Sequence, residues 1–299
     1  MGYLFLALAL GAGITKAYCG KRLGNATEKM ADAVSVNLFR MVLCIIIGFV
    51  LILVKGDFDH ILPNAGALVI MAVSGVATSV FLVTWLLSVN RGVYLLVEVF
   101  LMLGVLVPIL TSAFWFGETV SWAQWVGIGL LFLATVIMCS YNNTQKKKLD
   151  VVSMGLLILC GLSNGLADFM QKLFVQTAPE IPVSVFNFYT YVFSSVTLLP
   201  MLLAVTAKAK GSALGNFGRI VKKSGWLITI MAVCLFMNSY FKTVAAGYLE
   251  AAQLYPLNQG ASLILSALMA TVIFKEKFTV KTFLGILAAL AAILVMNLL

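Results

Sequence analysis

Residues 116–140 read FGETVSWAQWVGIGLLFLATVIMCS, and residues 274–298 read FKEKFTVKTFLGILAALAAILVMNL. A shift of 158 positions (116 to 274) overlays the two stretches without a gap. Each stretch is a turn followed by about 20 mostly apolar residues, the length of a helix that spans a bilayer. The chain therefore contains an internal repeat whose two units end on membrane-spanning helices. The identical pairs are Phe116/Phe274, Glu118/Glu276, Gly127/Gly285, Ile128/Ile286, Ala134/Ala292 and Met138/Met296.

The whole chain is too apolar for a water-soluble domain. Its 299 residues are 62% hydrophobic and 10% charged, with a mean hydropathy of +1.05. Soluble domains are about half apolar and about a quarter charged. The first apolar stretch lacks a basic segment before it, so it is interpreted as a retained span, not a signal peptide. The predicted spans are 2–19, 33–54, 65–88, 92–115, 122–141, 151–174, 183–206, 226–247, 250–273 and 279–298.

Because each repeat has five spans, an odd number, the second repeat enters the membrane from the opposite side. We therefore predict an all-α integral membrane protein with ten transmembrane helices in two inverted five-helix repeats, residues 1–145 and 146–299, integrated into one domain. This plan is common in secondary transporters, which bind substrate between the halves near the midplane. A duplicated scaffold without transport is the alternative. The last span of each repeat carries little charge and is expected at the periphery, packed on the other or on a second copy.

Charge and motif content narrow the functional classes. The net charge of +9 is interpreted as basic loop anchors, so no nucleic-acid partner is expected. The cysteines form no CxxC pair and are expected to be small buried hydrophobes, not metal ligands or disulfides. No P-loop, no GxGxxG after a strand and no Ser/His/Asp cluster is found, which disfavours ATP-driven transport, a cofactor and an enzyme. The cysteines are Cys19, Cys44, Cys139, Cys160 and Cys234.

Several short motifs carry a family resemblance over essentially the whole chain. Each half ends on a Phe-x-Glu turn and a glycine-containing span, 116–118 and 274–276 being the two turns; Tyr255-Pro256 precedes a small-residue run, and Gly11-x-Gly13 precedes Lys16. The chain thereby resembles the ten-span EamA-type branch of the drug/metabolite transporter superfamily. The resemblance implies a transporter, whose substrate can be an amino acid, nucleobase, sugar, drug or organic cation.

The membrane orientation has two opposed indications. Fifteen of the 20 Lys and Arg residues lie in the odd-numbered connections, which join spans 1 and 2, 3 and 4, 5 and 6, 7 and 8, and 9 and 10. The positive-inside rule assigns these connections to the cytoplasm and therefore both termini to the outside. The family resemblance implies the reverse, with both termini in the cytoplasm. A multi-pass protein of the plasma membrane, of the bacterial inner-membrane type, is expected in either case.

Glu98 is the strongest candidate for a functional residue. It lies inside the fourth predicted span, flanked by Val97, Val99 and Phe100, where the resemblance leads one to expect a proline. Ionisable groups inside a membrane span are costly and mark substrate or ion pathways. Glu98 is therefore predicted to couple transport to protons or to bind a cationic substrate. Its structural alternative is an ion pair with Arg40 or Lys16.

Five further charged residues lie within or at the edge of spans. Asp168 precedes Lys172 by four residues, which favours an intrahelical ion pair. Asp168 also overlays Lys16 in a looser alignment of the repeats, so both are candidates to face a central cavity. Arg40 resembles an arginine found early in the second span of family members. Lys242 is expected to extend to the membrane interface.

Polar uncharged residues are concentrated in the second half. In the ninth span they follow the i, i+3, i+4, i+7 spacing of one helical face, which indicates either helix-packing contacts or a pocket wall. We favour the pocket wall, because Pro256 also frees a backbone carbonyl there. Aromatic residues beside an acid can hold an organic cation. The candidate wall residues are Trp85, Tyr94, Asn187, Tyr191, Tyr255, Pro256, Asn258, Gln259 and Ser262.

Together these features predict a secondary active transporter for a small polar metabolite or organic cation, such as an amino acid, nucleobase or drug-like molecule. Proton coupling or exchange and alternating access are expected, with the lipid bilayer and a small-molecule substrate as partners and a monomer or homodimer as the assembly. The alternatives are an uncoupled channel or uniporter and a non-transporting membrane scaffold.

Overall fold

A computed structural model describes residues 1–23, 29–90, 94–142, 151–208, 212–275 and 280–298. Within these ranges the chain is helical apart from turns and short connections, and no described residue forms a β-strand. The elements are α1 (Gly2–Leu23), α2 (Met30–Lys55), a 3-10 turn η2 (Asp57–His60), α3 (Ala65–Asn90), α4 (Tyr94–Gly104), α5 (Leu106–Phe116), α6 (Trp122–Asn142), α7 (Val151–Thr177), α8 (Val183–Lys208), α9 (Ser212–Ala246), α10 (Ala251–Val272) and α11 (Val280–Leu298).

The outer faces of the helices are apolar. On α2, exposed Val42, Ile46, Phe49 and Leu53 recur at the spacing of one helical face. Six described helices, α1, α2, α3, α7, α8 and α9, are long and apolar enough to cross a membrane. Apolar stripes of this kind are stable against lipid and not against water, so the molecule is a multi-pass membrane protein. The predicted all-helical class is confirmed.

The fourth predicted span, 92–115, is divided into two helices. Helix α4 ends at Gly104 and α5 begins at Leu106. Pro108 has no backbone N–H, so the carbonyl of Gly104, four residues earlier, cannot receive the usual helical hydrogen bond. The intervening Val105 instead donates its N–H to Met102 at 3.2 Å, a tighter i to i−3 bond.

Helix α9 begins well before the predicted span 226–247. It contains a break at Ser224, where φ is −133° and ψ is 17°. The segment before the break carries three basic residues, Arg219, Lys222 and Lys223, and the segment after it is apolar. The sequence prediction therefore identified only the part of α9 that follows the break.

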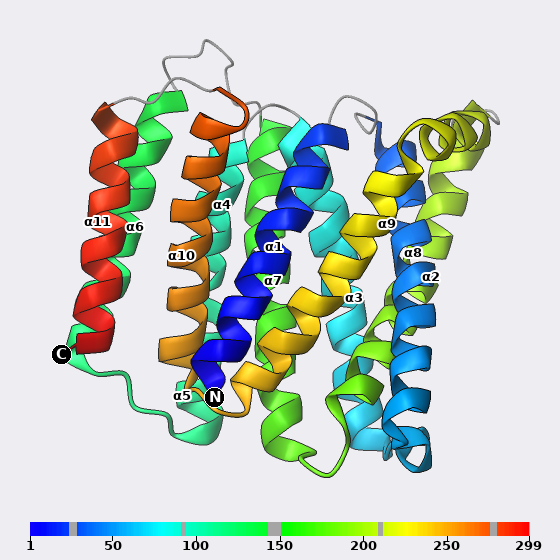
Figure 1. Cartoon of the computed structure of the whole chain (residues 1–299), viewed down its shortest axis with the longest axis horizontal. Coiled ribbons are helices and arrows are strands. Elements are labelled where there is room, and N and C mark those ends of the chain that lie inside the picture. Colours follow the sequence, from blue (N-terminus) through cyan, green and yellow to red (C-terminus); the bar gives the residue numbers. More distant parts are fainter. Residues whose placement is uncertain (24–28, 91–93, 143–150, 209–211, 276–279, 299) are drawn as a thin grey trace.

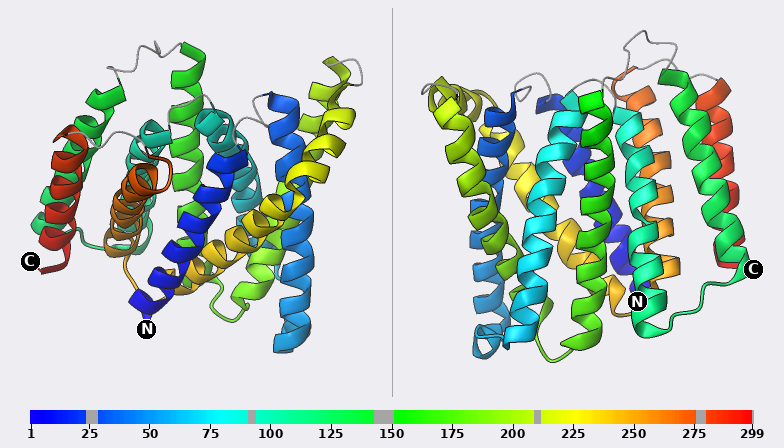
Figure 2. Two further views of the ribbon diagram at one scale, coloured as in Figure 1. Left: turned by 45° about the horizontal axis from the view of Figure 1, so that its top comes forward. Right: turned by 180° about the vertical axis from the view of Figure 1, so that it is seen from behind.

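The helices of the bundle pack in pairs whose members are distant in the sequence (Figure 1). Helix α1 lies along α9, α3 along α7 and α2 along α8. Figure 2, seen from behind, shows α3 beside α7. Helices α6 and α11 pack chiefly against each other at one side, joined to the rest through α4 and α10, as expected for the last span of each half. Both termini lie at the same end of the bundle.

Glycines bring α4 and α7 into backbone contact. A Cβ atom added at Gly161 of α7 would lie 2.2 Å from the carbonyl oxygen of Phe100. A Cβ at Gly165 would lie 2.1 Å from the oxygen of Gly104, and one at Gly104 would lie 2.1 Å from the oxygen of Gly161. Small residues four apart permit this close approach in membrane helices. The contact fixes α4, which carries Glu98, against α7.

Helix α6 begins at a capping box. The side-chain oxygen of Ser121 accepts the backbone N–H of Gln124 at 3.2 Å, and the side-chain oxygen of Gln124 accepts the backbone N–H of Ser121 at 2.8 Å. Two N–H groups that the first turn of a helix leaves without partners are satisfied in this way. The start of α6 at Trp122, four residues after Glu118, is therefore firmly placed.

Candidate functional site

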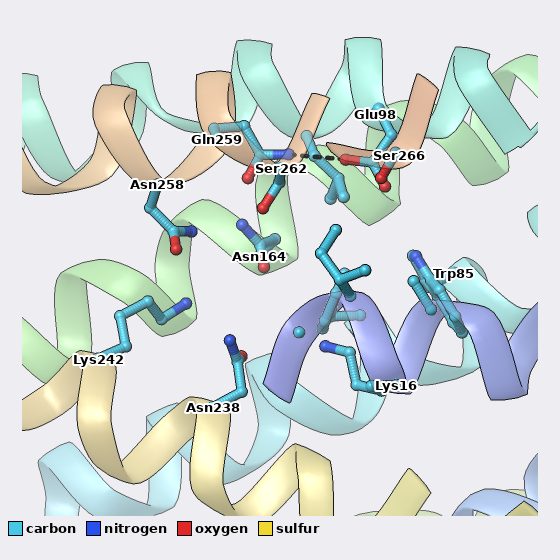
Figure 3. A pocket seen from close by; sticks show the side chains of 15 residues that line it. Lys16, Trp85, Glu98, Asn164, Asn238, Lys242, Asn258, Gln259, Ser262 and Ser266 are labelled. Atoms are coloured by element: carbon cyan, nitrogen blue, oxygen red, sulfur yellow. Dashed lines mark hydrogen bonds between the residues drawn. The ribbon is translucent and has the colours of Figure 1, made fainter. Parts of the chain in front are cut away.

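A cavity of about 60 Å³ lies inside the bundle between α1, α3, α4, α7, α9 and α10; we refer to it as the central cavity. Figure 3 shows Glu98 and Gln259 on one side of it and Lys16 and Asn238 on the other. Most of its labelled side chains are polar, which is unusual inside an apolar bundle. The lining residues are Gly13, Ile14, Lys16, Ala17, Phe81, Trp85, Glu98, Leu101, Asn164, Asn238, Lys242, Asn258, Gln259, Ser262 and Ser266.

Six of the residues predicted on a pathway or pocket wall meet at this cavity. Lys16, Trp85, Glu98, Asn258, Gln259 and Ser262 all line it, although they come from four helices. The polar face predicted on the ninth span, now α10, points inward through Asn258 and Gln259. The structure thus brings together residues separated by more than two hundred positions in the chain.

Glu98 is held by a partner from the facing helix. Its side chain is 5% exposed, and its Oε2 accepts a hydrogen bond from Nε2 of Gln259 at 3.2 Å (Figure 3). Neither Arg40 nor Lys16 forms an ion pair with any described residue, so the alternative of a structural pair with Glu98 is not what is observed. Glu98 therefore connects α4 to α10 through an amide.

Lys16 lies on the opposite wall, over aromatic rings. Its Nζ is 5.8 Å from the ring centre of Phe81 and 6.0 Å from that of Trp85. Cation–π contacts of this kind attract an ammonium group but supply no hydrogen-bond acceptor. Gly20, one turn further along α1, makes room for the Trp85 ring, since a Cβ there would lie 2.5 Å from it.

Asp168 does not pair with Lys172 as the sequence suggested. Its Oδ1 instead forms a buried ion pair with Lys242 of α9, and its Oδ2 accepts a hydrogen bond from Asn164 at 3.3 Å. Lys242 therefore points inward and lines the cavity, and the expectation that it extends to the interface is wrong. The competing partner lay 74 positions away, where the local i, i+4 rule could not detect it.

Lys172 pairs across the bundle with Glu118 at 2.9 Å. Its Nζ also donates to the backbone oxygens of Ala246 and Leu249, at 3.2 and 2.8 Å, where α9 ends. The second carboxylate oxygen of Glu118 accepts the backbone N–H of Ala251, at 2.8 Å, where α10 begins. We call this group, Glu118, Lys172 and the turn between α9 and α10, the terminal clasp. The corresponding Glu276 of the second turn lies outside the described residues.

Arg40 is fully buried and does not line the cavity. Its Nη1 donates to Oδ1 of Asn37 at 2.6 Å, and the amide of Asn37 donates to the carbonyl of Leu82. Nε and Nη2 of Arg40 are buried with no hydrogen-bond partner among the described residues. Arg40, which resembles an arginine of family members, therefore lies in the core and not on the cavity wall.

The polar residues of α8 also lie outside the cavity wall. Asn187 accepts a hydrogen bond from Ser239 at 2.7 Å, and Gln171 donates to Ser239 at 3.4 Å. The hydroxyl of Tyr191 donates to the carbonyl of Leu235 at 3.4 Å. These residues link α7, α8 and α9 to one another, which is the helix-packing role that polar side chains have in membranes.

Tyr255 and Pro256 take supporting positions. The hydroxyl of Tyr255 donates to the backbone oxygen of Asp168 at 2.6 Å, which joins α10 to α7. Pro256 is buried within α10 and does not line the cavity. The side chain of Tyr94, predicted on the wall, lies outside the described residues.

Three further polar residues line the cavity: Asn164, Asn238 and Ser266. Their spacing could have indicated them, because Asn164 lies four residues before Asp168, Asn238 four before Lys242, and Ser266 four after Ser262. The amide of Asn238 donates to the backbone oxygen of Ala9 at 2.7 Å, in space left by Gly13. Oδ1 of Asn258 is buried and has no hydrogen-bond partner among the described residues. The cavity therefore offers an acceptor that a bound molecule can use.

The described residues contain no metal-binding cluster. No group of three or more His, Cys, Asp or Glu side chains comes together in those ranges. The thiols of Cys19, Cys44, Cys160 and Cys234 are free, and the first three are buried. The central cavity consequently has the features of a binding site, with cations, an acid and amides, and its described part holds no nucleophile paired with a base.

Comparison with known proteins gives one family match, over the second half of the chain, and a set of similar folds. Residues 152–298 match the family model of the EamA-like transporter family. Twenty-eight chains of solved structures match the fold. One of them, a crystal structure described only as that of a protein, has a TM-score of 0.72 and 13% sequence identity, and the match covers 99% of this chain and 96% of the other. At this identity the likeness concerns the fold alone. A comparison with curated protein sequences gives no match.

Proposed function

We propose that this chain, which belongs to the EamA-like transporter family, is a secondary active transporter that moves a small polar metabolite or organic cation by alternating access. The observation that carries the proposal is the central cavity. Charged and amide side chains from five helices surround it inside an otherwise apolar bundle. Polar groups at such depth are costly in a membrane protein and mark a substrate or ion pathway.

Two inverted five-helix repeats, giving ten spans with α4 and α5 as one, are part of this proposal. The packing pattern supports them. In a repeat of this kind each span of the first half has a counterpart in the second half, so that α1 corresponds to α7, α2 to α8 and α3 to α9. When counterparts are exchanged, the contact of α1 with α9 becomes that of α7 with α3, and the contact of α2 with α9 becomes that of α8 with α3. Both members of each exchange are present. The pairs α2–α8 and α6–α11 map onto themselves, as expected at a pseudo-two-fold axis.

The terminal clasp is proposed as the contact that opens when the halves rock. It joins Glu118, from the turn between α5 and α6, to Lys172 and to the α9–α10 turn. Its partners thus come from both proposed halves and lie at one end of the bundle. A buried ion pair that crosses a moving interface gives two discrete arrangements, made or broken, because an intermediate separation leaves both charges unpaired.

Glu98 is proposed to bind the coupling proton. It is buried at the cavity, on the side opposite Lys16. Gln259 of α10 donates to it directly, while Lys242 of α9 is occupied by Asp168. Protonation changes the charge of the site by one unit, so the occupied and empty states of the cavity are expected to differ in proton affinity. Exchange of substrates without a proton is the second coupling mode.

The test is flux through the purified protein in proteoliposomes. Labelled alanine, uracil and choline represent the amino-acid, nucleobase and organic-cation classes, and each is measured with and without an imposed pH gradient. Uphill accumulation driven by the gradient, or acceleration by unlabelled solute on the opposite side, supports a secondary transporter. Flux that is never accelerated by opposing solute indicates an uncoupled channel. Liposomes that stay impermeable to all three solutes would point to a membrane scaffold.

We propose the plasma membrane as the location, with a monomer or homodimer as the assembly. The charge pattern of the loops supports insertion by the positive-inside rule, with the odd connections in the cytoplasm. The family resemblance supports the opposite orientation. Labelling of a single cysteine added at the N-terminus of the chain, with a membrane-impermeant reagent on whole cells, distinguishes the two: reaction in intact cells places the termini outside.

A further inference from the structure

We propose that the substrate carries a carboxylate and that Lys16 binds it in the central cavity. The proposal rests on the transport site proposed above, and narrows it to one chemical class. Three observations lead to it: an excess of cations around the cavity, the unmatched donors of Lys16, and a buried acceptor on Asn258.

Cations outnumber acids on the cavity wall, which carries Lys16 and Lys242 against one acid, Glu98. Lys242 is paired with Asp168, which does not line the cavity. Glu98 accepts a hydrogen bond from Gln259, and Lys16 has no carboxylate partner among the described residues. An anionic group of a ligand is therefore favoured beside Lys16.

Lys16 has hydrogen-bond donors to offer. An ammonium group has three N–H donors, and Lys16 makes no hydrogen bond or ion pair with any described residue. Its Nζ lies 5.8 Å and 6.0 Å from the ring centres of Phe81 and Trp85, which supply no hydrogen-bond acceptor, and Lys16 lines the cavity (Figure 3). A charged group in a poorly solvated site is stabilised by an anionic acceptor. A carboxylate matches this need.

A second recognition element lies on another wall. Oδ1 of Asn258 is buried, lines the cavity and has no hydrogen-bond partner among the described residues. This oxygen can accept a hydrogen bond from a hydroxyl or an ammonium group of a ligand. Glu98 lies on the same side of the cavity, and its carboxylate also favours a hydrogen-bond donor of the ligand. A carboxylate with a neighbouring hydroxyl or amino group meets Lys16 at one end and Asn258 at the other.

The size of the cavity guides the choice of a small probe. A volume of about 60 Å³ corresponds to roughly four water molecules at ~15 Å³ each. Three-carbon carboxylates are among the smallest molecules that carry both a carboxylate and a neighbouring donor. L-Lactate and L-alanine are therefore suitable probes, with propionate as the analogue that lacks the second donor.

The test is isothermal titration of the full chain in lipid nanodiscs with L-lactate, L-alanine, propionate and choline. We expect lactate or alanine to bind and choline not to bind. Lys16→Gln should weaken carboxylate binding by about tenfold to a hundredfold, the effect of losing a hydrogen bond to a charged group. Lys16→Arg should restore part of the affinity. Lys21→Gln, which removes the same charge from the same helix outside the cavity wall, should leave it unchanged.

Asn258→Leu separates the two recognition elements. It should weaken lactate and alanine binding while leaving that of propionate as it is. Melting curves establish that each variant is folded; should Lys16→Gln fail to fold, Lys16→Arg and Asn258→Leu carry the test.

Binding of choline without carboxylates, no carboxylate binding at millimolar concentration, or equal affinities in wild type and Lys16→Gln would each overturn the carboxylate proposal. Binding does not require flux. Carboxylate binding without transport would therefore overturn the transport function alone, and choline transport without carboxylate binding would overturn this inference alone.

Discussion

Gly161→Ala is expected to separate α4 from α7 and to destabilise the protein. The added methyl would lie 2.2 Å from the carbonyl oxygen of Phe100 and 3.0 Å from its carbonyl carbon. Both atoms belong to backbone, so no side-chain rotation can relieve the clash. The two helices must move apart by about 1 Å to reach ordinary contact. Gly165 and Gly104 lie in the same contact, so the movement opens more than one site.

The magnitude follows from two opposed terms. Overpacking in a well-packed interior costs typically about 1–3 kcal/mol. Alanine is the better helix former by about 1 kcal/mol, which offsets part of that cost. The rigid backbone contact places the cost at the upper end, so we expect a net loss of about 2 kcal/mol in the free energy of unfolding. Because α4 carries Glu98 and α7 carries Asn164, substrate binding should weaken as well.

Gly155→Ala is the matched control. It lies on the same helix, is exposed, and would have nothing within 4 Å of its added methyl. Thermal unfolding can be followed with a thiol-reactive dye, because Cys160 and other buried thiols become accessible on unfolding. We expect Gly161→Ala to melt several degrees below wild type and Gly155→Ala to melt at or above it. Equal melting temperatures for the two variants would refute the close-contact reasoning.

Three further predictions follow from the charged and capping contacts. Glu118→Gln or Lys172→Met alone should cost about 3–5 kcal/mol in a denaturation assay, because the remaining buried charge is unpaired, and the double variant should recover much of the loss; additive losses would show that the two side chains are not coupled. Glu98→Gln should leave the fold intact, seen as an unchanged melting curve, and should make flux in proteoliposomes independent of an imposed pH gradient; uphill flux driven by that gradient in the variant would exclude Glu98 as the proton site. Ser121→Ala should cost about 1 kcal/mol through loss of the bond to Gln124, while Ser121→Asn, another good capping residue, should melt close to wild type.

The helical class and much of the packing could be predicted from the sequence, because lipid imposes strong rules. A continuous apolar stretch of spanning length in a chain without long loops has few alternatives to a helix. The scarcity of charge in the last span of each half correctly placed α6 and α11 together at one side. The break between α4 and α5 was missed, although Pro108 was visible, because proline is tolerated in membrane helices and does not by itself fix a boundary.

Site residues were identified where several signals coincided. Asn258 and Gln259 belonged to a polar face with helical spacing, and Lys16 and Glu98 were charges inside spans. Asn164 and Asn238 lie four residues before Asp168 and Lys242, on the same helical faces. Lys242 was expected at the membrane interface, so its face was not assigned to the cavity. The partners in buried ion pairs were also missed. Asp168 had a basic residue at i+4 and used a distant one, since tertiary packing, not sequence separation, decides which charge is reachable in three dimensions.

The terminal clasp has a consequence for how a disturbance at the end of the bundle travels. Glu118 holds the first backbone N–H of α10, and Lys172 holds the last carbonyls of α9. Helix α10 has 22 residues, about 33 Å at 1.5 Å per residue, and Pro256 lies within it. Asn258 and Gln259 lie about two turns from its clasped end, just beyond this proline. A displacement of the clasped end therefore reaches both amides through a turn that lacks one helical hydrogen bond, and shifts their position at the cavity that they line.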